Sequence, residues 1–215
     1  MGLHTLLFAL GAFILIFQIG FWMKRAWDLV RTIQKVPEIR PEPLAALPET
    51  VPLISVIVPA HNEQAVIRAC LESVFQQDYP NFEVILVDDR STDNTAAIAR
   101  TVAKGRDNFT LISLDNRPNG WTGKCHALDK GVRHASGRWF AFLDADSSLH
   151  KSALRQCYDR ALRSKVGMLT VSTRFIMTSF WEKALQPVLA SMSLIIFPLA
   201  EVNEPCSKVA SANGM

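Results

Sequence analysis

Between residues 53 and 178 the chain alternates short, nearly continuous apolar runs with stretches in which apolar residues recur every three or four positions. The first pattern is typical of strands buried on both faces, and the second is typical of amphipathic helices. The predicted strands are 53–58, 82–87, 109–114, 139–143 and 168–173. The predicted helices are 64–76, 95–104, 124–134 and 151–164. This alternation predicts an α/β fold, a mostly parallel sheet with helices on both faces.

The first 35 residues carry a different pattern, a single apolar run from Leu3 to Met23 followed by basic residues. A run of this length spans the roughly 30 Å hydrocarbon core of a bilayer at about 1.5 Å per helical residue. The basic residues follow the run, which is unlike a cleaved signal peptide, and by the positive-inside rule they place the rest of the chain in the cytoplasm. Residues 1–35 are therefore predicted to be a single-pass anchor in the cell (inner) membrane. A buried core helix is the alternative.

Two further segments complete the predicted organisation. Residues 36–52 hold five of the eleven prolines and are expected to form a stiff linker, because proline disfavours both helix and sheet pairing. Residues 179–215 begin with a stripe of apolar residues at helical spacing. The stripe predicts an amphipathic helix, kinked or ended by Pro187 and Pro198, that either lies on the membrane surface or packs into a core.

Composition narrows the function classes. The net charge of +3 is too small to argue for nucleic-acid binding, so no nucleic-acid partner is expected. The four cysteines include no C-x-x-C pair, which argues against a zinc site or a disulfide framework. No G-x-G-x-x-G follows the first predicted strand and the chain has no G-x-x-x-x-G-K-[ST], which argues against a dinucleotide cofactor and a P-loop.

Polar residues gather directly after four predicted strands, at residues 59–63, 88–93, 119–124 and 144–146. The carboxyl ends of parallel strands lie at one edge of a sheet, and ligands of such sheets bind there. The sequence therefore predicts a single polar site built from all four segments.

Asp144 and Asp146 are the strongest candidates for a metal site. Alternate side chains of an extended chain share a face, so the two carboxylates of this D-x-D motif can point the same way. Such a pair suits Mg²⁺ or Mn²⁺, which would neutralise a diphosphate and assist a departing nucleoside diphosphate as a Lewis acid. Lys124, beside two glycines at a helix start, would add charge on the same phosphates. Asp89 could accept a hydrogen bond from a base imide N–H, which favours uracil.

Three motifs then carry a family resemblance: VIVPAHNE at 56–63, VDDRSTD at 87–93 and DAD at 144–146. In order and spacing they resemble the inverting family 2 glycosyltransferases of GT-A fold. A longer motif, PNGWTGKCHAL at 118–128, is similar to membrane-bound members associated with hopanoid or carotenoid modification. The resemblance implies a Rossmann-like GT-A nucleotide-sugar-binding domain over residues 53–178, preceded by one transmembrane helix.

The resemblance also implies roles for individual residues. The implied nucleotide-sugar-binding residues are Pro59, His61, Glu63, Asp88, Asp89, Lys124 and Asp144. Asp89 would meet the uracil and Lys124 would lie near the diphosphate. Asp144 would lie near the ribose and the metal, and Asp146 would be the direct metal ligand.

Several of these positions have plainer explanations that the sequence leaves open. His61 could be an ordinary loop histidine, and Glu63 a charge that complements a helix dipole. Asp88 could be a strand-end residue that binds backbone amides. Asp93 is interpreted as an N-cap rather than a ligand, and Arg90 as solvent-facing.

The expected function is metal-dependent transfer of a sugar, with inversion, from a nucleotide-diphosphate sugar, a UDP-sugar, to a lipid or lipid-linked acceptor. Inversion needs a general base for the acceptor hydroxyl. No acidic base motif of the family follows Thr173, so the base is expected beyond Met215 and the chain is interpreted as an N-terminal fragment. One alternative is an inactive, truncated nucleotide-sugar-binding membrane protein. A nucleotidyltransferase ranks last, because its Gly-rich loop after the first strand is missing.

Overall fold

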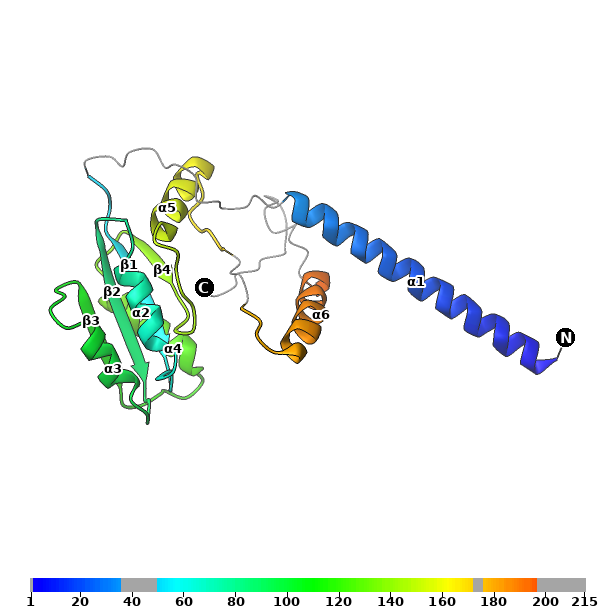
Figure 1. Ribbon diagram of the computed structural model, residues 1–215, viewed down its shortest axis with the longest axis horizontal. Coiled ribbons are helices and arrows are strands. Elements are labelled where there is room, and N and C mark those ends of the chain that lie inside the picture. The colour runs from blue at the N-terminus through cyan, green and yellow to red at the C-terminus, as the bar shows by residue number, and fades with distance from the viewer. Residues whose placement is uncertain (1, 36–49, 172–175, 197–215) are drawn as a thin grey trace. The chain divides into compact units, whose positions relative to one another are not determined.

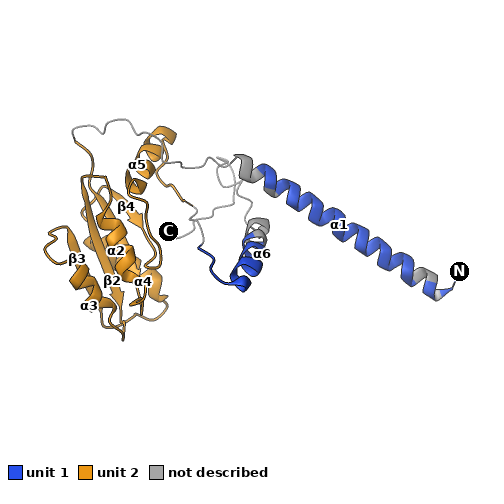
Figure 2. Ribbon diagram, viewed as in Figure 1, with its two compact units in different colours: residues 1–38, 174–212 blue, residues 39–173, 213–215 orange. Residues whose placement is uncertain are grey.

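The computed structural model describes residues 2–35, 50–171 and 176–196. The chain divides into two units, residues 1–38 with 174–212 and residues 39–173 with 213–215 (Figure 2). Most of the expected linker therefore lies outside the described residues, which begin again at position 50.

The second unit is built on a parallel sheet whose described strands lie in the order β3-β2-β1-β4 (Figure 1). The strands are β1 (Ile54–Ala60), β2 (Phe82–Asp89), β3 (Phe109–Leu114) and β4 (Trp139–Phe142). All three neighbouring pairs are parallel. Parallel neighbours need long connections, and the helical segments between the strands supply them. The prediction of an α/β fold with a parallel sheet is confirmed.

Helices cover both faces of this sheet. They are α2 (Ile67–Phe75), α3 (Thr95–Val102), α4 (Gly123–His134) and α5 (Ala153–Ser164). On one face Val58 and Leu86 belong to a buried cluster that includes residues of α2, α3 and α5. On the other face Val87 packs with Ala127 of α4. Because successive strand residues point to opposite faces, continuous apolar strands bury side chains in both clusters.

The first strand runs further than its sequence pattern predicts, through Pro59 to Ala60. Successive residues of a parallel strand turn their backbone groups to opposite neighbours, and the carbonyl of Ile57 faces β4, where it accepts from the N–H of Leu143 (3.0 Å). Pro59 therefore faces the same side, but the pairing with β4 ends at Ile57. Its missing N–H costs no ladder bond, so the strand continues.

Most other boundaries agree with the predictions to within one or two residues, and two differences are larger. Helix α2 begins at Ile67 instead of residue 64, because the carbonyl of Glu63 first closes a turn by accepting from the N–H groups of Val66 (3.0 Å) and Ile67 (2.9 Å). The predicted strand 168–173 is not formed over residues 168–171, and its last two positions lie outside the described residues. Met168 is 67% exposed there, so this apolar run has no neighbouring strand to pair with.

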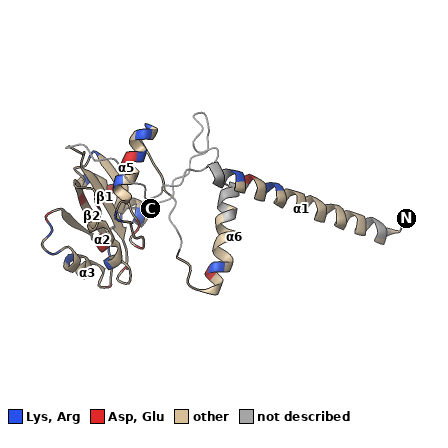
Figure 3. Cartoon of the chain, turned by 45° about the horizontal axis from the view of Figure 1, so that its top comes forward, with Lys and Arg blue, Asp and Glu red and all other residues tan. Residues whose placement is uncertain are grey.

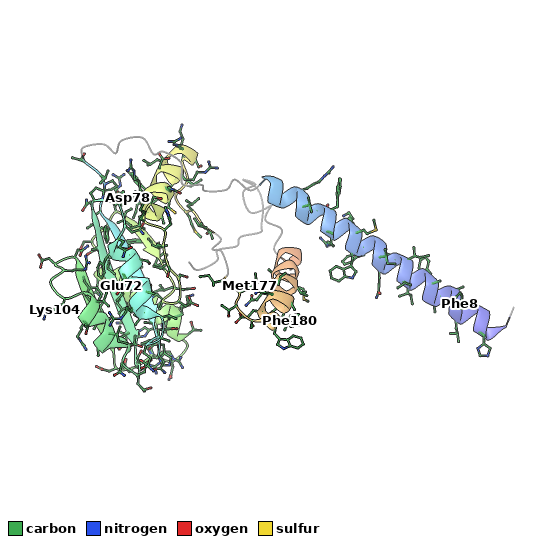
Figure 4. The ribbon with its side chains drawn as sticks, in the orientation of Figure 1. Phe8, Glu72, Asp78, Lys104, Met177 and Phe180 are labelled. Atoms are coloured by element: carbon green, nitrogen blue, oxygen red, sulfur yellow. The ribbon has the colours of Figure 1, made fainter. Side chains whose placement is uncertain are left out.

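The first unit contains α1 (Leu3–Lys35). Its segment Leu7–Asp28 is long and apolar enough, by length and composition, to cross a membrane. Large apolar side chains project from it into solvent, and Phe8 is 81% exposed (Figure 4). The basic residues gather toward the C-terminal end of the helix (Figure 3). The predicted apolar N-terminal helix is therefore present, and it continues beyond the predicted apolar run to Lys35.

The same unit contains α6 (Phe180–Ile196), the predicted amphipathic helix. It continues through Pro187, so this proline does not end it, and Pro198 lies outside the described residues. Aromatic side chains at its start are exposed: Phe180 is 74% and Trp181 68% accessible (Figure 4).

Candidate functional site

The carboxyl ends of β1 and β2 lie side by side, because Ala60 is paired with Asp88 in the sheet register. The loop after β1 is also tied to the end of β2, since His61 Nδ1 donates to the backbone carbonyl of Asp89 (2.6 Å). The first two polar segments, residues 59–63 and 88–93, therefore meet at the same edge of the sheet, as the parallel topology predicts.

Hydrogen bonds interlace the loops that follow these two strands. The N–H of Asn62 donates to Ser91 Oγ (2.9 Å), and Asn62 Oδ1 accepts from the N–H of Thr92 (2.8 Å). The N–H of Glu63 donates to Thr95 Oγ1 (2.8 Å). Asn62 has a φ of 57°, a left-handed conformation that asparagine tolerates better than most residues. The loops after β1 and β2 therefore form one hydrogen-bonded polar surface at the carboxyl edge of the sheet.

Two aspartates of this polar surface accept hydrogen bonds from backbone N–H groups. Asp88 is buried and its Oδ1 accepts from the N–H of Ser91 (3.2 Å), which is the strand-end contact considered from the sequence. Asp93 Oδ1 accepts from the N–H of Thr95 (2.9 Å), and its Oδ2 accepts from the N–H of Gln64 (3.1 Å). Asp93 thus satisfies the N–H of Thr95, the first residue of α3, although the N-cap position itself is occupied by Asn94 and not, as predicted, by Asp93.

Asp89 is the buried acidic residue at the end of β2, only 5% exposed. Its carboxylate accepts two hydrogen bonds from the Arg90 guanidinium, from Nε at 2.8 Å and from Nη2 at 3.3 Å. The hydrogen-bonded Arg90 holds the pKa of Asp89 below its ordinary value, against burial, which acts in the opposite direction; His61 and Arg117 add positive charge nearby. A Cβ added at Gly123 would overlap Asp89 Oδ2, so the start of α4 lies directly against this carboxylate.

The start of α4 brings the third polar segment to the site. Thr122 caps the helix by accepting from the N–H of Cys125 (3.4 Å), which leaves Gly123 and Lys124 in the first turn. Lys124 Nζ lies 2.6 Å from Asp144 Oδ1. The lysine expected near the diphosphate is therefore paired, in this structure, with the first aspartate of the D-x-D motif.

Carboxylates also crowd around Glu63 in the loop after β1. Its pKa is raised above the ordinary value, first by burial and then by the negative charges of Asp146 and Asp93, with Asp144 adding to them and His61 opposing. Asp146 itself is exposed, whereas Asp144 is partly buried. The D-x-D motif and Glu63 thus lie in one negatively charged region. All four polar segments therefore contribute to the same edge of the sheet.

Three contacts at this site were not foreseen from the sequence. Arg90 is exposed, as expected, but its guanidinium also binds Asp89. Arg117 lies near the same carboxylate, and Gly123 lies against it. Trp121, which could have stacked on a ligand or packed, contacts the buried ring of His126 edge-to-face with centroids 5.8 Å apart and stays 42% exposed. Only the glycine before Lys124 carried a usable signal, since glycine marks close backbone approach.

The carboxylates of this site suit a divalent cation that is shared with a bound ligand better than one that is held by the protein alone. Asp144 and Asp146 offer hard carboxylate oxygens, which Mg²⁺ and Mn²⁺ prefer. Within residues 2–35, 50–171 and 176–196, no group of three or more His, Cys, Asp or Glu side chains could hold a metal by itself. Mg²⁺ typically binds through one or two carboxylates together with substrate phosphates and water. The residues therefore suit a cation that is completed by a bound diphosphate.

Open parallel α/β sheets bind their ligands beyond the carboxyl ends of the strands, which is where this chain gathers its acidic and basic side chains. Residues 55–206 match the family described as glycosyl transferase family 2. The chain belongs to this family of glycosyltransferase enzymes, and the expected GT-A fold is confirmed by the structural likeness given next.

Relatives and solved structures agree with this assignment. The chain is 37% identical over 109 residues to glycosyltransferase AglE of Haloferax volcanii, covering 50% of this chain and 34% of that protein. It is 36% identical over 132 residues to 4,4'-diaponeurosporenoate glycosyltransferase of Staphylococcus aureus, covering 60% and 34%. It resembles a mannosyltransferase from Pyrobaculum calidifontis, solved with GDP-Man and Mn²⁺, with 30% identity, a TM-score of 0.54 and coverage of 69% and 42%. The chain spans about one third of the length of the two curated relatives.

Proposed function

We propose that the chain forms the donor-binding part of a membrane-associated glycosyltransferase. It would take a sugar from a nucleoside-diphosphate sugar and transfer it, with inversion and with the help of a divalent cation, to a lipid or lipid-linked acceptor. The observation that carries the proposal is the gathering of Asp89, Lys124, Asp144 and Asp146 at one sheet edge. A nucleotide-sugar ligand is supported by the Pyrobaculum mannosyltransferase, which was solved with GDP-Man.

Each part of the site suits one part of the donor. Pro59, near the end of β1, would line the nucleotide pocket beside Asp88, together with His61 and Glu63 of the loop that follows. Asp89, as a buried acceptor, would receive the N–H of the base, for which uracil is our first choice. Lys124 would bind the diphosphate, to which it brings a mobile point charge.

Asp144 and Asp146 would hold Mg²⁺ or Mn²⁺, with Asp144 also close to the ribose. A divalent cation, when bound, supplies positive charge that stabilises the departing nucleoside diphosphate. In this structure Lys124 forms an ion pair with Asp144. We expect the lysine to serve the phosphates once a donor is present, because a diphosphate carries more negative charge than one carboxylate.

The membrane part of the proposal rests on α1 and on one relative. The span Leu7–Asp28 would anchor the chain in the cell membrane, and the basic residues at its C-terminal end would place the sheet unit on the cytoplasmic side. A lipid acceptor is suggested by the name of the diaponeurosporenoate glycosyltransferase. We assign no general base among the described residues.

Binding measurements test the donor site. The full chain in lipid nanodiscs would be titrated calorimetrically with UDP, with Mn²⁺ or Mg²⁺ present and again with a chelator. Asp146→Asn should reduce UDP affinity with Mn²⁺ to the level that the wild type shows with chelator. The control is Asp107→Asn, which changes an exposed aspartate outside the site and should leave affinity unchanged. Metal-dependent affinity that survives Asp146→Asn would remove this residue from the metal site.

The non-catalytic alternative, nucleotide-sugar binding without transfer, is separated by a second measurement. Nanodiscs that contain isoprenoid lipids would be incubated with radiolabelled UDP-sugars, and label in the lipid extract would be counted. Tight binding without lipid-extractable label would favour a binding protein over a complete transferase.

A further inference from the structure

Arg90 adopts a backbone conformation that its side chain disfavours. Its φ is 60°, in the left-handed region where residues with a Cβ are uncommon. Glycine would occupy this position without strain. An arginine that is kept in such a conformation points to a function of its side chain.

The Arg90 guanidinium donates two hydrogen bonds to the carboxylate of its neighbour, Asp89. Nε donates to Asp89 Oδ1 at 2.8 Å, and Nη2 donates to Asp89 Oδ2 at 3.3 Å. The Arg90 side chain is 37% exposed and the Asp89 side chain only 8%. A two-point bond from a planar guanidinium fixes the plane of the carboxylate as well as its position.

The other groups around Asp89 leave its carboxylate little freedom. Gly123 lies against Oδ2, and the guanidinium of Arg117 is close, with Nη1 3.8 Å from where a Cβ of Gly123 would stand. His61 donates to the backbone carbonyl of Asp89 at 2.6 Å. Asp89 is therefore an oriented acceptor flanked by cationic donors.

We propose that Arg90 is a positioning residue that orients Asp89 to select nucleobases carrying a ring N–H beside a carbonyl, a role that rests on the proposed nucleoside-diphosphate binding. Uracil and guanine present such an N–H, which a fixed carboxylate accepts, while their carbonyl faces donors such as Arg117. Cytosine and adenine present a ring lone pair at the corresponding place. A lone pair against an oriented carboxylate leaves two acceptors facing each other, which weakens binding.

The charge state of Asp89 gives a second consequence. Hydrogen bonding by Arg90 lowers the pKa of Asp89, and burial acts to raise it. Without Arg90, Asp89 would become protonated at a higher pH, with Arg117 and His61 as the remaining positive groups. A protonated carboxyl can donate as well as accept. Loss of Arg90 should therefore relax the choice of base and move the acid limit of binding upward.

The test compares Arg90→Gly, Arg90→Lys and a matched control in the full chain in nanodiscs. The control is Lys165→Gly, because Lys165 is also a cationic residue with positive φ, 52°, but it caps the C-terminus of α5. Dissociation constants for UDP, GDP, CDP and ADP would be measured with Mn²⁺ from about pH 3, below the ordinary pKa of an aspartate, to about pH 8. Since these ligands carry the same diphosphate, the ratio of their constants isolates the contribution of the base.

Arg90→Gly should weaken UDP or GDP binding at neutral pH by about tenfold and narrow the preference over CDP and ADP by a similar factor. Its binding should also be lost at a higher pH than that of the wild type. Arg90→Lys should recover part of the preference, since it restores charge without the two-point bond. Lys165→Gly should match the wild type. An Arg90→Gly protein with unchanged base preference and pH profile would overturn the proposal.

Thermal unfolding without ligand keeps this outcome separate from failure of the proposed function. Because the folded-state pKa of Asp89 is lowered, its pairing stabilises the fold above the unfolded-state pKa and is lost as pH falls through the folded-state pKa. The melting temperature of the wild type relative to Arg90→Gly should therefore fall on acidification. If this difference is present but the wild type binds no nucleoside diphosphate, Arg90 still positions Asp89, while the proposed function and the base selection that rests on it both fail.

Discussion

Replacing Gly123 by alanine is the most direct test of how the site is assembled. Gly123 is the first residue of α4, and a Cβ there would overlap Oδ2 of Asp89 and stand 3.6 Å from its Cγ. The backbone of α4 cannot retreat freely, because the helix packs on Val87 through Ala127. The Asp89 carboxylate must therefore move.

Two opposing effects set the size of the stability change. Alanine is a better helix former than glycine by about 1 kcal/mol in a helix interior, and by less in the first turn. Moving the carboxylate breaks a charge-assisted pair with Arg90, and such hydrogen bonds contribute about 1.5–3 kcal/mol. The pair is partly exposed, so the lower end of that range applies. We expect Gly123→Ala to lower the free energy of unfolding by about 1 kcal/mol, or the melting temperature by about 2–4 °C.

The effect on binding should be larger than the effect on stability. A displaced Asp89 no longer presents its oxygens where the base N–H would meet them, so UDP affinity should fall about tenfold or more. The two quantities would be measured by thermal unfolding and by calorimetry on the full chain in nanodiscs. Gly167→Ala is the control, because nothing lies within 4 Å of a Cβ there and its φ is not positive. Wild-type UDP affinity in Gly123→Ala would refute the placement of Asp89 as the base acceptor beneath α4.

Three further predictions concern other parts of the structure. Gly137→Ala should destabilise the sheet by about 3 kcal/mol or more, read from the melting temperature, because its Cβ would lie 2.7 Å from the backbone N of Ser55, which cannot rotate away. Burial raises the pKa of the Cys70 thiol to about 12, so only about one molecule in ten thousand is thiolate at pH 8; iodoacetamide should label exposed Cys125 and spare Cys70 in peptide maps of the native protein. Deleting residues 1–35 should move the protein from the membrane pellet to the supernatant, and continued sedimentation would identify α6 as a second membrane contact.

The fold was largely predictable because its strands are buried on both faces. Short, largely apolar runs rich in β-branched residues, such as Ile54–Val58, favour such strands, and the amphipathic segments between them favour helices. The predictions failed where the neighbouring chain decides the outcome. Whether Pro59 ends β1 depends on where β4 stops, and whether residues 168–171 form a strand depends on a partner. Neither fact is visible in a local pattern.

The sequence predicts which segments meet at the site, but it does not predict which side chains pair with one another there. Parallel topology alone brings the strand ends together, so the location of Asp89 and Asp144 follows from the order of strands. Their partners depend on loop dihedral angles and side-chain directions. The bond from Arg90 to Asp89 requires a left-handed residue where the sequence shows only an arginine, and the Lys124–Asp144 pair requires the turn before α4.

The pairing of charges at this edge is consistent with the proposed joint binding of a cation and a diphosphate. Arg90 balances Asp89 and Lys124 balances Asp144. The pKa of Glu63 is raised, first by burial and then by the negative charges of Asp146 and other carboxylates. A diphosphate brought to this region alone would meet more negative charge than Lys124 can offset. A divalent ion alone would find too few protein ligands among the described residues. Each supplies what the other lacks, so the geometry favours their joint binding over that of either one.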